Sequence, residues 1–243
     1  MTISRRIIKI VFSRCGNRCA FPDCNQEITF KDKSERDAIV GIMAHIKAEK
    51  EGFARYDPKQ TDEERNSADN LILLCQNHHK IIDDQPDIYS VEKLMDMKKY
   101  HENSVKQRFT KEITEITFAE LNVITKYLLR NIDSEQEIES ISPQLKIKKN
   151  ELSADVEGLI KKGMSRKKLV DRYIDTNPDN EFGERLKEGF VKEYNQLKKD
   201  LKGDDLFEAL LSFSCGASSK DKEKATGLVI LSYFFEKCDV FEK

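Results

Sequence analysis

Apolar residues are grouped differently in the first third of the chain and in the part that follows. Early on, the short apolar runs at 38–48 and 71–74 stand between charged segments. Runs of this kind are typical of buried strands. The polar segment 49–68 between them allows the two strands to pair as an antiparallel hairpin with a long connection. We expect a helix to begin near His78, directly after the second strand.

From residue 106 onward, apolar residues recur at helical spacing, and this half is predicted to be all-helical. Leu121, Ile124, Leu128 and Leu129 form one apolar stripe of a helix over 118–132. The polar segment Ser134 to Pro143 is expected to be a linker. Further helices are expected at 150–163, 165–176, 181–200, 204–214 and 219–236.

The last stretch, residues 225–243, is much more apolar than a free tail. It fits two interpretations: the final core helix of a small bundle, or a docking element for another protein. Residues 5–14 form a short basic helix or strand with one apolar face, which is either a solvated edge or a DNA contact.

Composition narrows the classes of protein that these elements can form. The chain has 243 residues, of which 35% are charged and 38% hydrophobic, with a net charge of −2. It has no run of about eighteen apolar residues and no signal-peptide pattern at its start, so we expect a cytoplasmic protein with no membrane span. The small net charge argues against a protein that coats nucleic acid, although a local basic groove is compatible with it.

The cysteines are spaced for metal binding rather than for disulfides, which are rare in the cytoplasm. Cys19 and Cys24 are separated by four residues, and the turn-forming pair Pro22-Asp23 lies between them. Fifty residues later, Cys75 and His78 have C-x-x-H spacing. Together they predict one tetrahedral zinc site of three cysteines and one histidine. Cys15 is an extra thiol and an alternative ligand to Cys19.

A second metal site is indicated beside the first. His79 and Asp83 are four residues apart, so on a helix they would lie on the same face. His45 is embedded in the first apolar strand, where a lone histidine is usually a core residue. However, three of the four histidines (45, 78 and 79) fall within these two segments.

These motifs together resemble a zinc-bearing HNH endonuclease over roughly residues 10–105. The resemblance rests on the segments Asn-Arg-Cys-Ala-Phe-Pro-Asp-Cys, Ala-His-Ile, Asp-Asn-Leu-Ile-Leu-Leu-Cys-Gln-Asn-His-His-Lys-Ile-Ile-Asp and Lys-Lys-Tyr-His-Glu. It also rests on the position of His79, nine residues after Asn70. The resemblance implies an α+β chain that begins with a ββα-metal domain built around one Mg²⁺ or Mn²⁺ ion.

The family's roles carry over to four residues. His45 resembles the general base that activates water, and Asn70 resembles the residue that braces the loop and helps to orient the imidazole. His79 resembles the metal ligand on the helix, and Asp83 lies where some members have a second one. DNA cleavage would leave 5′-phosphate and 3′-hydroxyl ends. The structural Zn²⁺ would be held by Cys19, Cys24, Cys75 and His78.

The sequence departs from the family at Ala44, where many members have a further metal ligand. Three interpretations follow: Asp83 supplies the missing ligand, the metal is held loosely with more water, or the site is degenerate. His101, in the Lys-Lys-Tyr-His-Glu segment, is interpreted as a packing or surface residue.

The end of the chain resembles, over roughly residues 145–243, the C-terminal association domains of bacterial three-component systems built on an ABC-type ATPase. These systems are associated with defence against phage or plasmids. The resemblance implies an effector nuclease with an ABC/SMC-like ATPase partner. The expected domains are therefore an HNH domain at 1–105, a helix and linker at 106–145, and an all-α association domain at 146–243.

Two other functions remain open at this point. One is a stand-alone restriction endonuclease whose C-terminal half reads DNA, and the other is an inactive HNH-derived module that only binds. Because a single HNH site cuts one strand, clean double-strand breaks would require a homodimer or two successive nicks.

Overall fold

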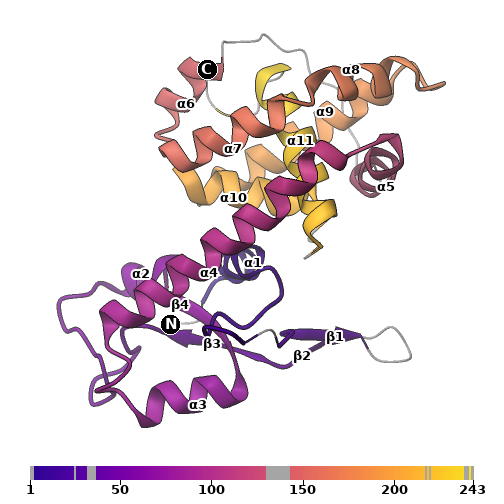
Figure 1. Ribbon diagram of the computed structural model, residues 1–243. Coiled ribbons are helices and arrows are strands. Elements are labelled where there is room, and N and C mark those ends of the chain that lie inside the picture. The colour runs from indigo at the N-terminus through magenta and orange to yellow at the C-terminus, as the bar shows by residue number, and fades with distance from the viewer. Residues whose placement is uncertain are drawn as a thin grey trace. The chain divides into compact units, whose positions relative to one another are not determined.

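The computed structural model describes residues 3–24, 26–31, 37–129, 143–216, 218, 220–237 and 241. The chain divides into two compact units, Met1–Gln107 and Arg108–Lys243. The first unit is α+β and the second is helical, so the predicted class, an α+β domain followed by an all-α region, is confirmed. Figure 1 labels the helices and strands.

The first unit contains two small antiparallel sheets. The elements in chain order are α1 (Arg5–Cys15), β1 (Thr29–Lys31), β2 (Asp37–Ile39), β3 (Gly41–His45), α2 (Asp62–Arg65), the 3₁₀ helix η1 (Ala68–Asn70), β4 (Leu71–Cys75), α3 (Gln76–Asp84) and α4 (Val91–Lys111). Strand β1 pairs with β2, and β3 pairs with β4. The predicted hairpin with a long connection is therefore present, and α3 packs against both β3 and β4 (Figure 1).

The hairpin and the helix that follows it form the ββα core of the unit. All five residues of β4 are buried, which explains why this short run is almost wholly aliphatic. In the register of the pair, His45 lies opposite Leu71, at the end of β3. The backbone N–H of Ile46 donates to the carbonyl of Asn70 and extends the pairing by one step. This register places the end of β3 directly beside the start of β4.

Residues 38–48 do not form the single strand that the sequence predicts. The chain breaks at Val40, because the N–H groups of Val40 and Gly41 both donate to the carbonyl of Ile28. A Cβ at Gly41 would lie 2.1 Å from Cγ2 of Ile28, so only glycine allows this close approach. The segment 5–14 is part of α1, which buries Ile10 and Val11 and packs on β4.

The second unit is a bundle of short helices around α11. Its elements are η2 (Glu112–Glu115), α5 (Phe118–Leu128), α6 (Pro143–Lys149), α7 (Ala154–Met164), α8 (Lys167–Asp175), α9 (Phe182–Leu197), α10 (Gly203–Ser214) and α11 (Asp221–Lys237). Residues 134–142 of the predicted linker lie outside the described residues. Its last residue, Pro143, is the first residue of α6. No helix of the described ranges is long and apolar enough to cross a membrane.

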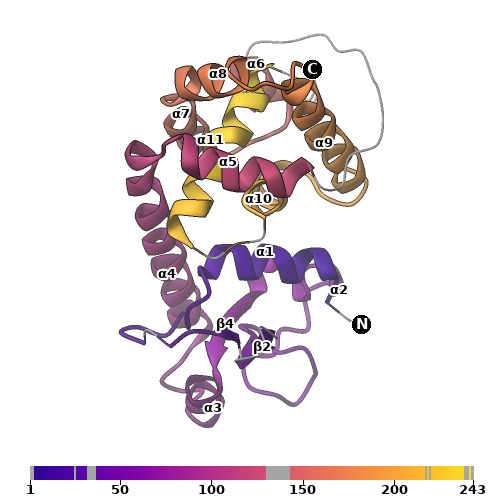
Figure 2. The same cartoon turned by 90° about the vertical axis from the view of Figure 1, so that its right-hand side faces the viewer.

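Helix α11 is the core of this unit. Every residue from Lys224 to Phe235 is buried, and the helix contacts α5, α7, α8 and α10, among which it runs in Figure 2. Gly163 of α7 permits one of these contacts, because a Cβ there would lie 2.2 Å from Oγ of Ser232. For residues 225–237 the structure therefore shows the core helix, one of the two interpretations of the last stretch, whereas residues 238–240 and 242–243 lie outside the described residues.

Candidate functional site

The structure brings the four predicted zinc ligands together. Their ligand atoms all lie within 4.8 Å of one another. The Nδ1 atom of His78 is 3.1 Å from Sγ of Cys75 and 3.6 Å from Sγ of Cys19. Three thiols and one imidazole are a donor set that suits a tetrahedral metal site. The remaining thiol of the region, that of Cys15, donates to the carbonyl of Phe12 within α1 and is not among these four ligands.

The segments around the cluster hold its ligands in place. The N–H of Cys24 donates to the carbonyl of Phe21, which closes the predicted turn, and the N–H of Cys75 donates to Sγ of Cys19 at 3.2 Å. The Phe21 ring stacks on the imidazole of His78, with centroids 3.8 Å apart. Burial raises the pKa of Cys19 to about 12 and lowers the pKa of His78. A bound metal must therefore displace the proton of the Cys19 thiol, while the His78 imidazole is already favoured in its neutral, ligating form.

A cavity of about 380 Å³ is lined by His45, His79 and Asp83, the residues of the second predicted metal site and its neighbouring histidine. These three residues come from β3 and α3, and residues of the connection that follows β3 line the rest of the cavity. Ala44 also lines it. The complete lining is Ala44, His45, Ala48, Glu49, Lys50, Phe53, Ala54, Arg55, His79 and Asp83.

His45 presents an unpartnered nitrogen in this region. Its Nε2 atom is buried and has no hydrogen-bond partner among the described residues. Buried polar atoms are nearly always hydrogen-bonded, and an exception calls for an explanation such as a ligand or a catalytic role. This residue lies at the end of β3 and in the cavity lining, so the unpartnered nitrogen belongs to a side chain that borders the cavity.

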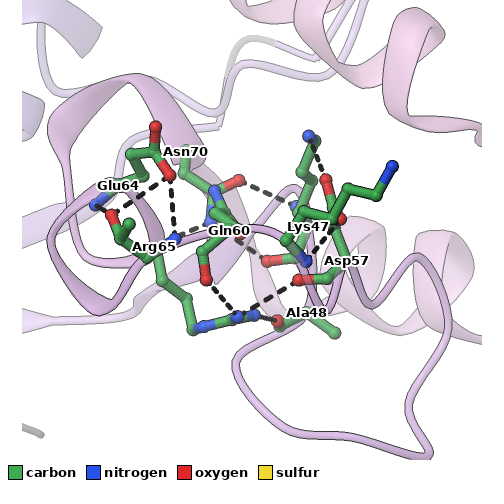
Figure 3. Close-up of polar contacts among 9 residues, drawn as sticks. Lys47, Ala48, Asp57, Gln60, Glu64, Arg65 and Asn70 are labelled. Carbon is green, nitrogen blue, oxygen red and sulfur yellow. Dashed lines mark hydrogen bonds and ion pairs between the residues drawn. The ribbon is translucent and has the colours of Figure 1, made fainter.

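Asn70 is buried beside the end of β3 and uses its whole side-chain amide (Figure 3). Its Oδ1 accepts from the N–H of Lys47 at 2.9 Å, and its Nδ2 donates to the carbonyls of Lys47 and Arg65 at 3.0 and 2.9 Å. All three bonds go to backbone groups. Two of them reach Lys47, which lies two positions after His45. Asn70 therefore fixes the backbone that carries the histidine, rather than the imidazole itself.

Replacement of Asn70 by alanine is expected to lower the free energy of unfolding of the full chain by about 3 kcal/mol, since buried backbone groups that lose their partners are costly. Denaturant titration followed by circular dichroism measures this change. Asn66→Ala is the matched control, because the half-buried Asn66 side chain donates a single bond, to the carbonyl of Asp62. A loss for Asn70→Ala no larger than that for Asn66→Ala would contradict the bracing role.

His79 and Asp83 lie side by side on α3, as their spacing predicts. Nδ1 of His79 is 3.5 Å from Oδ2 of Asp83. Two ligands in adjacent positions around an ion with bonds of about 2.1 Å are about 3 Å apart, so this pair could bind one small cation with little movement. Among the described residues, the Cys/His cluster is the one group of three or more metal-binding side chains. A cation at His79 and Asp83 would thus keep several positions for water or substrate, as Mg²⁺ commonly does.

Two buried arginines hold the connection between β3 and β4, and the sequence gives no sign of either. Arg65 donates to the carbonyls of residues 48, 57 and 60 (Figure 3). Its guanidinium lies 4.7 Å from the centre of the Tyr56 ring. Arg55 lines the cavity and bonds to Asp83. Both occur in a segment rich in charged residues, and only the folded chain distinguishes them from its solvated lysines and glutamates.

His101 has the packing role expected of it. It lies on α4, and its Nε2 donates to the carbonyl of Cys15 at 2.8 Å. This bond satisfies the carbonyl at the end of α1.

The hairpin, the helix and the Cys/His cluster define the first unit as an HNH endonuclease domain, and residues 19–85 match the HNH_2 family of HNH endonucleases. Residues 119–242, just over half of the chain, match C-terminal domain 10 of the ABC-three component (ABC-3C) systems. The chain belongs to this ABC-3C family. A comparison with curated proteins found no match.

Proposed function

We propose that the chain is a metal-dependent DNA endonuclease that hydrolyses phosphodiester bonds in the cavity lined by His45, His79 and Asp83. The observation that carries the proposal is the unpartnered Nε2 of His45 in a unit whose cavity also contains an adjacent pair of cation ligands. The HNH_2 match supports the same chemistry. Mg²⁺ or Mn²⁺ suits the pair, because carboxylate and imidazole are ligands of these ions.

Each of these residues has a separate task in the proposed reaction. Nε2 of His45 accepts a proton from the attacking water, a task that suits a neutral imidazole near pH 7. Asn70 holds the backbone after His45 and so positions the base. His79 and Asp83 would hold the cation, which would supply positive charge toward the phosphate and the departing 3′ oxygen. The products then carry 5′-phosphate and 3′-hydroxyl ends.

At the Cys/His cluster, we assign Zn²⁺ to Cys19, Cys24, Cys75 and His78. Zinc is the usual ion for three thiolates and one imidazole in a closed site. Its role is structural, because it ties the loop after α1 to the end of β4 and the start of α3 in a unit with small sheets.

The second unit suggests how the nuclease is used. Its match to an ABC-3C domain supports a component of a multi-protein system rather than a stand-alone restriction enzyme. We propose that the chain is the effector of a bacterial defence system against phage or plasmids, with an ABC/SMC-like ATPase as partner of the helical unit. A homodimer would allow one site to act on each strand.

The test is an assay on supercoiled plasmid with the full chain, with and without Mg²⁺ or Mn²⁺. We expect open circular DNA only when the metal is present, and religation by DNA ligase because of the 5′-phosphate and 3′-hydroxyl ends. Cleavage that appears only after addition of an ATPase complex encoded beside this chain would support a partner-gated nuclease. Absence of cleavage under both conditions would contradict the proposal and favour an inactive binding module.

A further inference from the structure

Resting on the proposed function, we propose that Arg55 is a positioning residue that fixes the Asp83 carboxylate for cation binding. Its guanidinium holds one carboxylate oxygen, so that the other faces His79 and the cation. Arg55 lies in the cavity lining but has no ligand atom for a metal.

Arg55 joins three segments of the first unit through one buried side chain, which is 8% exposed. Its Nε donates to the carbonyl of Ile46, the residue after His45, at 3.1 Å. Its Nη1 donates to the carbonyls of Ile82 at 3.0 Å and Tyr89 at 3.3 Å, at and beyond the end of α3. The planar guanidinium is thus fixed in orientation by carbonyls from three separate segments.

The remaining nitrogen of this guanidinium is directed at the proposed ligand. Nη2 of Arg55 lies 3.3 Å from Oδ1 of Asp83. The other oxygen, Oδ2, is the atom 3.5 Å from Nδ1 of His79. Because Oδ1 is occupied by Arg55, Asp83 would bind the cation through Oδ2 alone. The positive charge of Arg55 also offsets the negative charge of the carboxylate, which favours retention of the phosphate next to it.

Without Arg55, little would hold this carboxylate in place. The Asp83 side chain is 52% exposed, so a free carboxylate could rotate toward water. Loss of a partner that orients a metal ligand commonly weakens metal affinity by about 10–100-fold.

The backbone at Arg55 supports a specific role for this side chain. Its φ is +65°, a left-handed conformation that is uncommon for residues other than glycine. Such conformations persist only where the surrounding structure enforces them, and they are concentrated at functional sites. Here the connection is also held by an ion pair of 2.8 Å between Lys47 and Asp57 and by the carbonyl bonds of Arg65.

The alternative to a positioning role is that Arg55 only stabilises the connection between β3 and β4. Arg65 is a matched control for this alternative. Both side chains are buried, and both donate to backbone carbonyls around the same connection. The hydrogen bonds of Arg65 in the described structure go to residues 48, 57 and 60, whereas Arg55 reaches Asp83. If Arg55 had only a structural role, replacing either arginine would change Mn²⁺ binding alike. If Arg55 positions Asp83, only its replacement would weaken Mn²⁺ binding.

The experiment measures Mn²⁺ binding by electron paramagnetic resonance on the full, zinc-loaded chain, for the parent, Arg55→Gln, Arg55→Lys, Arg65→Gln and Asp83→Asn. We expect Arg55→Gln to raise the Kd for Mn²⁺ about tenfold or more, Arg55→Lys to raise it less, and Arg65→Gln to leave it near the parent value while lowering the Tm. In the Asp83→Asn background, Arg55→Gln should weaken binding no further, because the two residues act as one unit.

Three outcomes would overturn the inference. They are a parent-like Kd for Arg55→Gln, an equal increase for Arg65→Gln, or a parent chain that binds no Mn²⁺ beyond its zinc site. Arg55→Lys keeps the charge and serves as the second variant if Arg55→Gln does not fold. Failure of the proposed function is a different result, because a chain that binds Mn²⁺ in this Arg55-dependent way but never nicks DNA would retain the positioning role without the nuclease.

Discussion

Replacement of His45 by alanine is expected to slow metal-dependent nicking of supercoiled plasmid by at least about 100-fold. A positioned general base typically contributes about 10²–10⁴-fold to the rate, and alanine cannot accept the proton. His45 is the candidate because its Nε2 is buried and unpartnered and the residue lines the cavity with His79 and Asp83. The measurement is the initial rate of conversion to open circles at saturating DNA and Mn²⁺.

The control for this variant is a change at another histidine of the same unit. His101→Gln keeps a side-chain N–H that can donate to the carbonyl of Cys15, and His101 is not part of the cavity lining. We expect this variant to nick at about the parent rate. Zinc content and Tm establish that His45→Ala is folded. If folded His45→Ala nicked as fast as the parent at saturating metal, the assignment of the general base would be wrong.

Sequence spacing was sufficient for those parts of the site that depend on local geometry. His79 and Asp83 are on one helical turn, so their spacing alone places them side by side. The two halves of the Cys/His cluster each have a ligand spacing that a short turn or a helix start can satisfy, and the structure brings the halves together. The buried aliphatic run of β4 also follows directly from its composition.

Contacts between distant segments account for what the sequence could not predict. The predicted strand over 38–48 is interrupted because the N–H groups of Val40 and Gly41 donate to the carbonyl of Ile28, which lies outside the predicted strand. Similarly, Arg55 and Arg65 are distinguished from neighbouring charged residues by the hydrogen bonds that they donate to backbone carbonyls in the folded chain. Such partners have no signature in the spacing of residues.

The second large effect is expected from the zinc site. Cys75→Ser should release the metal and lower the Tm of the first unit by more than about 10 °C, because structural zinc contributes about 10–16 kcal/mol of binding free energy to folding in small zinc domains. Cys75 is the last residue of β4, the strand that pairs with β3 and its His45. Loss of the metal should therefore also abolish nicking. Elemental analysis of zinc per chain and thermal unfolding measure both effects.

Cys15→Ser is the matched control, since Cys15 is a buried thiol close in sequence to the cluster but bonds to the carbonyl of Phe12. We expect this variant to keep one zinc per chain and a Tm within about 3 °C of the parent. If Cys15→Ser lost zinc, Cys15 would have to replace one of the four assigned ligands. If Cys75→Ser kept both zinc and Tm, the cluster would not be a structural zinc site, and the stability of the ββα core would have to come from the packing of β4 alone.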